Sequence, residues 1–260
     1  MANFIADAVR EVGRRTLFFL IEMGRFSNLM ARVFSELHGL FRDHGLFFRQ
    51  AVNLGFNSLP LVMIVGMFTG AVSGWQGHYQ FEGYLPYNLI GPGVFKGVML
   101  ELGPVLTALV IAGRVSASIA AEIGTMKVTE QIDALESMAI SSVRYLAVPR
   151  IAALTVMMPI LVIQAVFIAL MGAAFVTTFL LGLTSTEFWG LIPNFFKVYD
   201  VFAGLLKSVF FGLSASMIGC YVGFRTEGGA EGVGLATIQA FVWSCLTILV
   251  LDFVLAVMLF

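Results

Sequence analysis

Long apolar stretches alternate with short polar segments along most of this 260-residue chain. An α-helix needs roughly 20 apolar residues to cross a hydrocarbon core about 30 Å thick. The pattern predicts five such helices, at residues 57–77, 95–121, 151–183, 201–224 and 233–260. We interpret the third as one long, tilted helix that Pro159 can bend, with a re-entrant segment as the alternative.

The first 50 residues follow a different pattern, in which apolar and basic positions are interleaved. Phe, Leu and Ile side chains recur among four arginines: Arg10, Arg14, Arg15 and Arg25. This is typical of an amphipathic helix lying in the membrane interface, with arginines reaching anionic head groups. A partly spanning segment at 17–21 is the alternative, but that apolar run is short and flanked by charge. We therefore divide the chain into an interfacial amphipathic region, 1–50, and a five-helix transmembrane domain, 51–260.

A polar segment, residues 122–136, lies between the second and third predicted spans. Five of its fifteen residues are ionisable, whereas the whole chain is 12% charged. Apolar residues recur in it at helical spacing, which predicts a short helix with one apolar and one acidic face: Ile123, Met126, Ile132 and Leu135. Such a helix either docks a soluble partner or is simply solvated at the interface, and the pattern alone favours neither.

Composition agrees with a membrane protein. The chain is 59% hydrophobic with 25 Phe, and its mean hydropathy is +0.93, far outside the range of soluble proteins. The fold class that follows is an all-α polytopic membrane protein. Both cysteines, Cys220 and Cys245, fall inside apolar segments, so we expect packing roles rather than a disulfide or a metal site.

The distribution of Lys and Arg predicts the orientation. If the N-terminus is cytoplasmic, twelve of the fifteen basic residues fall on the inner side, and only Lys96, Lys197 and Lys207 fall on the outer side. This is a positive-inside bias. Five crossings then put the C-terminus outside and residues 122–136 in the cytoplasm.

Three glycines of the first span, Gly66, Gly70 and Gly74, are spaced four residues apart. This small-xxx-small spacing lets two helix backbones approach closely, although glycine is also common in membrane helices generally. We expect a tight helix–helix contact here, either within the chain or across a dimer.

Ionisable residues inside a span are costly and require a reason, and three stand out within the predicted spans: Glu101, Arg114 and Asp252. For Arg114 we favour a structural role, in which it pairs with an acid or caps backbone carbonyls. For Glu101 we favour a position beside a polar-lined substrate cavity. The role of Asp252 stays open.

Motifs for catalysis are not found in the sequence. His38, His44 and His78 have no paired-ligand spacing, and neither a Walker A pattern nor a dinucleotide-binding glycine pattern occurs. We therefore expect no catalytic residue, no metal, no cofactor and no enzymatic activity in this chain. The energy for any work it performs would come from another subunit.

Several motifs occur in a fixed order around the second span: Glu101-Leu-Gly-Pro-Val105, Ala112-Gly-Arg114 with Ser116 and Ser118, Ala121-Glu-Ile-Gly124, Met126, and Thr129-Glu-Gln-Ile-Asp-Ala-Leu135. In this order they resemble the MlaE-type permeases, which belong to ABC transporters that move lipids between membranes. The first span and the C-terminal part share further features with that family: Leu59-Pro60, Gly70, Gly74, Gln76-Gly77 and Leu251-Asp-Phe-Val-Leu255. The resemblance covers roughly residues 45–260. One departure is Leu100, because many relatives have a basic residue before the matching glutamate.

The resemblance implies a homodimeric permease that moves phospholipids or related lipids between inner and outer membranes. It implies three kinds of partner protein: a cytoplasmic ABC ATPase on each subunit, a periplasmic MCE-domain protein and, in many systems, a STAS-domain protein. No nucleic acid is implied. The expected location is the bacterial inner membrane, with the N-terminus cytoplasmic and the C-terminus periplasmic.

The resemblance also suggests site residues. Residues 122–136 would be the coupling helix that receives the ATPase, through Glu122, Gly124, Met126, Thr129, Glu130, Gln131 and Asp133. The first span and Glu101 would border the lipid cavity, which we expect to be lined by Leu61, Val65, Phe68, Val72, Trp75 and Tyr79. Acyl chains suit such walls, because burying each CH₂ is worth about 0.8 kcal/mol.

Two other function classes are alternatives to a lipid permease. A secondary transporter or channel would need ion-coordinating groups near the midplane and often an internal repeat, and five unequal spans without a visible repeat argue against it. A membrane scaffold would need no acids at the midplane, yet Glu101 and Asp252 are present. Neither the lipid, the direction of transport nor the subunit stoichiometry follows from the sequence.

Overall fold

The computed structural model describes residues 2–38, 44–81 and 86–260, apart from the side chains of residues 2–12, 15, 18 and 19. Within this part the regular structure is helical throughout and contains no β-strand. In chain order the helices are α1 (Ala2–Glu36), α2 (His44–Gln50), α3 (Leu59–Phe81), α4 (Ile90–Gly97), α5 (Gly103–Ile111), α6 (Ala117–Val128), α7 (Gln131–Ser137), α8 (Val148–Phe179), α9 (Ser185–Gly190), α10 (Ile192–Phe195), α11 (Val198–Phe224) and α12 (Gly229–Leu259).

Short helical turns join several of these helices into longer rods. Two are 3-10 turns, η3 (Phe56–Ser58) and η4 (Tyr87–Leu89). The others are π turns: η2 (Ala51–Gly55), η5 (Val98–Leu102), η6 (Ala112–Ser116) and η7 (Val143–Ala147). Two of the π turns, η5 and η7, end two residues before a proline, Pro104 or Pro149. Proline has no N–H to donate to the carbonyl four residues earlier, so the regular α ladder is interrupted there.

The described part contains five continuous helical segments long and apolar enough to cross a membrane: His44–Phe81, Tyr87–Val128, Val143–Phe179, Val198–Phe224 and Gly229–Leu259. The predicted fold class, a polytopic all-α membrane protein with five spans, is thereby confirmed. The third span is one helix with Pro159 inside it and no re-entrant segment. It ends at Phe179 rather than at residue 183, and the chain then reverses through Gly182, whose φ is +71°.

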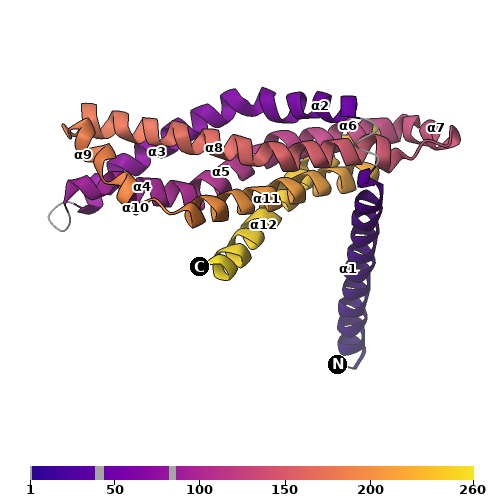
Figure 1. Cartoon of the computed structure of the whole chain (residues 1–260). Helices are drawn as coiled ribbons and strands as arrows, with labels where there is room; N and C mark the ends of the chain where they lie inside the picture. Colours follow the sequence, from indigo (N-terminus) through magenta and orange to yellow (C-terminus); the bar gives the residue numbers. More distant parts are fainter. Residues whose placement is uncertain (1, 39–43, 82–85) are drawn as a thin grey trace.

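Four of the five spanning helices run side by side along a common direction, and α12 slants away from them toward the C-terminus (Figure 1). α7 and the end of α6 lie at one end of this bundle, and α9 and α10 lie at the other. α8 packs on α3 and on α11. α11 also packs on α12, and the Tyr199 hydroxyl at the start of α11 donates a 2.7 Å hydrogen bond to the Leu259 carbonyl at the end of α12. α12 forms an edge of the bundle, and most of its surface is exposed.

The predicted glycine contact lies within the chain, between α3 and α8. Gly66, Gly70 and Gly74 face three alanines of α8 that repeat at the same spacing: Ala165, Ala169 and Ala173. A Cβ atom placed on Gly66 would lie 2.9 Å from the Ala165 carbonyl oxygen, and one on Gly70 would overlap the Ala169 carbonyl. The two backbones are therefore in direct contact, which only glycine at these positions permits.

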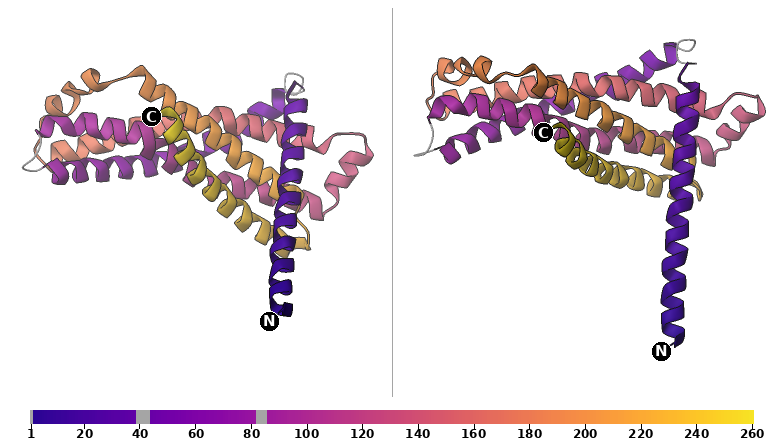
Figure 2. Two further views of the ribbon diagram at one scale, coloured as in Figure 1. Left: turned by 90° about the horizontal axis from the view of Figure 1, so that it is seen from below. Right: turned by 60° about the horizontal axis from the view of Figure 1, so that its bottom comes forward.

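Helix α1 runs across the direction of the bundle and meets it near α7, in each of the three views (Figures 1 and 2). Side chains of its second half pack against the core of the bundle: Phe26, Leu29, Met30 and Val33. Other large apolar residues on the same helix are exposed: Leu17, Leu20, Ile21, Met23 and Phe34. Residues 17–21, the alternative spanning segment, are an internal part of one long helix. The side chains of Arg10 and Arg15 lie outside the described part.

Candidate functional site

Three charged side chains meet inside the bundle, each from a different span. The Lys207 ammonium, on α11, lies 2.7 Å from a carboxylate oxygen of Glu101 in η5 and 3.0 Å from one of Asp252 in α12. The Lys207 side chain is fully buried, Asp252 is 22% exposed and Glu101 is 44% exposed. Opposite charges in contact offset the cost of placing each charge in an apolar environment.

Local backbone chemistry explains why a lysine fits at this level. Because Pro104 lacks an N–H, the carbonyl of Leu100 has no α-helical donor from that position. The Lys207 ammonium donates to this carbonyl at 3.3 Å, in addition to the two carboxylates. All three of its donors therefore have acceptors, as a buried ammonium requires.

The position of Lys207 corrects the sequence analysis. We had assigned it to the outer side of the membrane, but it lies within α11 and is fully buried. Of the other two lysines assigned to that side, Lys96 forms a 3.6 Å ion pair with Asp200, at the start of α11, and Lys197 is exposed. The signal that could have revealed the cluster was the presence of one base and two acids in three separate apolar spans.

Arg114 lies in η6 and does not meet an acid in the described part of the chain. Its guanidinium donates to the Ser58 hydroxyl, which itself donates to the Leu54 carbonyl at 2.6 Å. The pairing that we expected of Arg114 is made instead by Arg150, which lies 3.0 Å from Glu122 and donates to the Leu146 carbonyl at 2.8 Å. Arg114 thus joins the second span to the start of the first, and Arg150 joins the third span to α6.

The residues expected to line a lipid cavity lie along α3. Five of them have exposed side chains on the face of α3 opposite its glycines: Leu61, Phe68, Val72, Trp75 and Tyr79. Val65 is half-buried and borders a narrow crevice between α3, η5, α5 and α8, together with Thr69, Leu102 and Leu106. Within one chain, the predicted residues therefore form an open apolar face rather than an enclosed cavity.

Residues 122–136 do not form the single helix that we predicted. Glu122, Gly124 and Met126 belong to α6, the continuation of the second span, and α6 ends at Val128. Thr129 and Glu130 form a turn in which Glu130 has a φ of +59°, and α7 begins at Gln131. The left-handed residue breaks the ladder of α-helical hydrogen bonds, so α7 points in a new direction from α6.

Helix α7 is held by polar contacts near both ends. At its start, the Lys127 ammonium lies 2.8 Å from the Asp133 carboxylate. At its end, Ser142 donates to Glu136 at 2.8 Å, and the neighbouring Ser141 donates to Glu36 of α1. Ile132 is buried beneath the helix. These contacts join α7 to α6 and to Ser142 before η7, and Ser141 joins the same segment to α1.

The permease MlaE family model matches residues 47–258, which is most of the chain and includes all five spans and α7. The chain belongs to the MlaE permease family. This match agrees with the resemblance expected from the motifs around the second span.

Relatives extend the comparison over nearly the full length of this MlaE-family chain. A probable ABC transporter permease protein of Rickettsia typhi is 38% identical over 96% of each chain. One of Synechocystis is 41% identical over 80% of this chain and 79% of its own. The intermembrane phospholipid transport system permease protein MlaE of Haemophilus influenzae is 32% identical over 98% of each. The chain is thus a multi-pass inner-membrane protein with the role of an ABC transporter permease, and this role implies a separate ATPase subunit.

In this MlaE-family permease, the polar face of α7 and the turn before it are exposed. Thr129, Glu130, Gln131 and Asp133 are exposed, whereas Gly124 is buried against Thr226 of the α11–α12 loop and Met126 is half-buried. The sequence analysis missed Met138 and Ile140, which are 62% and 40% exposed just beyond α7. Their signal was an apolar pair directly after the acidic segment. Met138 and Ile140 place two exposed apolar side chains next to the acidic face of α7.

Proposed function

We propose that this chain is the membrane permease of an ABC system that moves phospholipids between the inner and outer membranes. A separate cytoplasmic ATPase supplies the energy, since the sequence has no nucleotide-binding motif of its own. Membership of the MlaE family and the name of the Haemophilus influenzae relative, an intermembrane phospholipid transport permease, support this assignment. The exposed apolar face of α3 supports acyl chains as the transported groups.

The observation that carries the proposal is the attachment of α7. This helix combines an exposed acidic face with polar contacts to Lys127 of α6 and to Ser142, the residue preceding η7. The neighbouring Ser141 contacts Glu36 at the end of α1. An ATPase that binds α7 and moves it would act directly on the second and third spans. We therefore infer that α7 and the turn before it form the coupling element, which is shorter than the predicted 122–136.

The substrate path in this proposal needs two copies of the chain. One copy leaves the α3 residues Leu61, Phe68 and Trp75 exposed, and a homodimer would turn this open face into the wall of a cavity. Glu101 is the most accessible member of the buried charge cluster and would meet the polar head group. Lys207 would hold its carboxylate in place.

The remaining parts of the proposal concern orientation and partners. The N-terminus, α7 and the ATPase lie on the cytoplasmic side, as the distribution of Lys and Arg predicts. The α9–α10 end then faces the periplasm, where an MCE-domain protein would sit, and a STAS-domain protein would accompany the ATPase. The C-terminus lies on the periplasmic side.

The proposal is tested by coexpressing the chain with the ATPase encoded beside it and measuring copurification. We expect Glu130→Lys combined with Met138→Asp to reduce recovery of the ATPase at least about ten-fold, because both changes alter only exposed residues that flank α7. The thermal stability of the permease should be unchanged. Normal ATPase recovery with the double variant would refute docking at α7.

Asp133 needs a different design, because it is paired with Lys127 inside the chain. Exchanging the two residues, by Lys127→Asp with Asp133→Lys, preserves an ion pair while reversing the surface charge at both positions. This exchange should impair docking without loss of folding. Lipids retained by the purified complex, identified by mass spectrometry, test the substrate separately.

A further inference from the structure

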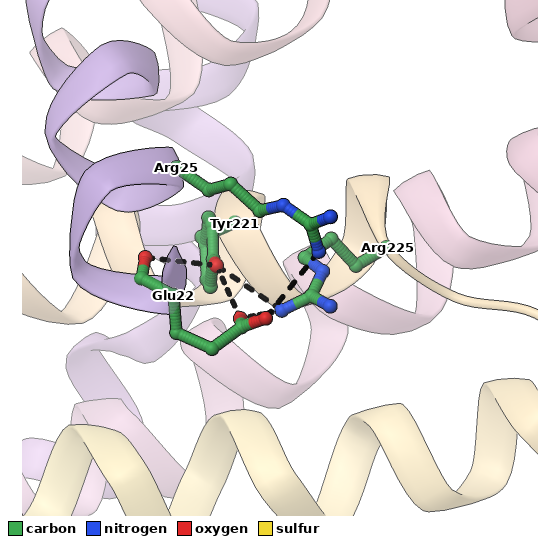
Figure 3. Close-up of polar contacts among 4 residues, drawn as sticks. All are labelled: Glu22, Arg25, Tyr221 and Arg225. Carbon is green, nitrogen blue, oxygen red and sulfur yellow. Dashed lines mark hydrogen bonds and ion pairs between the residues drawn. The ribbon is translucent and has the colours of Figure 1, made fainter. Parts of the chain in front are cut away.

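Helix α1 is attached to the end of α11 by a compact polar cluster (Figure 3). The Tyr221 hydroxyl donates to the Glu22 carboxylate at 2.7 Å and receives a 3.1 Å hydrogen bond from Arg225. Arg225 also forms an ion pair with Glu22, and Arg25 lies 3.4 Å from the same carboxylate. Phe26 packs edge-on against the Tyr221 ring at 5.3 Å. Two guanidinium groups are thus brought together by a single carboxylate.

Next to this cluster lies an open cavity of about 370 Å³ between α1, η7 and the end of α11. Its lining combines the three arginines Arg25, Arg32 and Arg225 with apolar side chains of Leu29, Val143 and Phe224. This volume is at the lower end of the range typical of small-molecule sites, about 300–1,000 Å³. The cavity therefore has room for a polar group with a short apolar extension.

The charge balance of the cavity favours an anion. Besides the three arginines, its lining contains one carboxylate, Glu136, which accepts a hydrogen bond from Ser142. Two further carboxylates lie beside the lining: Glu22, which is paired with Arg25 and Arg225, and Glu36, which accepts hydrogen bonds from Ser141. Arg32 makes no side-chain ion pair or hydrogen bond within the described residues, and its guanidinium is exposed. A guanidinium offers several donors in a plane that suits phosphate oxygens.

The level of the cavity along the bundle points to the source of that anion. Tyr221, Phe224 and Arg225 belong to the last turn of α11 and the residue after it, and Val143 begins the third span, so the cavity lies where two spans end. Exposed Leu20, Ile21 and Met23 show that α1 itself needs apolar surroundings at the same level. Lipid phosphates lie just outside the hydrocarbon core, at the ends of spanning helices.

We propose that this cavity binds the phosphate group of a phospholipid of the adjacent leaflet, with Arg32 as its principal ligand and Arg25 and Arg225 beside it. Leu29, Val143 and Phe224 contact the glycerol and the first acyl carbons. This site goes beyond the proposed transport function. It lies at the end of the bundle that carries α7, apart from the exposed face of α3, and a lipid bound there contacts both α1 and the bundle. Binding there stabilises the attachment of α1 to α11.

The test is native mass spectrometry of the full-length chain in detergent, titrated with phosphatidylglycerol. We expect Arg32→Gln to raise the concentration for half-occupancy about five-fold, since one basic residue at a membrane surface contributes about that factor. Arg32→Lys should lose less, because it keeps the charge. Arg49→Gln is the matched control: Arg49 is also an exposed arginine at the same end of the bundle, in α2, but it does not line the cavity.

Two outcomes would overturn the proposal. If Arg32→Gln and Arg49→Gln bind phosphatidylglycerol equally, the cavity is not the lipid site. If inorganic phosphate displaces the lipid at concentrations comparable to those of the lipid, the cavity holds free phosphate and the lipid assignment fails. Neither result depends on transport, so the coupling proposal would stand or fall separately.

Discussion

Glu101, Lys207 and Asp252 show how single residues are adapted to an apolar environment. One ammonium contacts two carboxylates, so the cluster contains one more acidic group than basic groups. Glu101 is the member with the most accessible side chain, at 44% exposure. The uncompensated charge is therefore best tolerated there. This is why we assign Glu101 to the substrate and Lys207 and Asp252 to its positioning.

We expect Lys207→Met to be strongly destabilising, because it leaves two carboxylates without their cation. Removing one partner of a buried pair costs about 3–5 kcal/mol, and the lower figure applies here because Glu101 is partly exposed. The measurement is thermal unfolding of the purified permease. Lys197→Met is the control, since Lys197 is exposed and should tolerate the change.

A triple variant separates stability from function at the same site. Lys207→Met with Glu101→Gln and Asp252→Asn removes all three charges, so most of the lost stability should return. Lipid transport should remain impaired if the Glu101 carboxylate meets the head group. A stable triple variant that transports normally would show that the cluster has only a structural role.

At the scale of elements, the contact between α3 and α8 determines how the first span is placed. The glycines of α3 and the alanines of α8 form two matching rows, so the helices touch through backbone atoms. Lipid provides no hydrophobic drive for this association, which rests on close packing alone. The exposed residues of α3 are then directed away from α8.

A methyl group on Gly70 would overlap the Ala169 carbonyl, which is backbone and cannot turn aside. We expect Gly70→Ala to separate α3 from α8 and to cost about 1–3 kcal/mol of unfolding free energy, as overpacking generally does. Gly97→Ala is the control, because no atom lies within 4 Å of a Cβ at that position. Equal thermal stability of the two variants would contradict the close contact.

At the scale of the whole molecule, the single chain leaves large apolar faces open on several spans, among them α3, α8 and α12. Trp75 and Phe175 are both 53% exposed in the isolated chain. Any difference between them in the working complex must therefore come from assembly. The proposed dimer encloses the α3 side chains around lipid and leaves Phe175 facing the surrounding bilayer.

Photocrosslinkers at Val72 and Trp75 should therefore label lipid retained by the purified complex more strongly than one at Phe175. Detergent replaces bilayer lipid around the complex during purification, whereas an enclosed cavity keeps its lipid. Crosslinked lipid can be quantified by mass spectrometry of the labelled peptides. Equal labelling at the three positions would mean that the face of α3 simply contacts the membrane.

The sequence by itself determined the membrane-spanning helices of this protein. The length and apolarity of each run decide whether a helix can span the membrane, so the five spans and the polar interruption between the second and third were predictable. The spacing of Gly66, Gly70 and Gly74 is also a property of one helix, so a close helix–helix contact could be predicted from it, although the partner helix could not. The motifs around Glu101 and Arg114 were sufficient to indicate the family.

Only the tertiary structure decided which residues meet. Lys207 is 106 positions from Glu101 and 45 from Asp252, and Tyr221 is 199 positions from Glu22. No local periodicity carries information about such pairs, so Lys207 was misplaced. For Arg114 we expected an acid or backbone carbonyls, and its partner is the Ser58 hydroxyl. The break at Glu130 also escaped prediction, because apolar spacing at 122–136 continues through a turn whose left-handed residue leaves no mark in that pattern. Side-chain partners depend on how helices stack, and stacking is a property of the whole bundle.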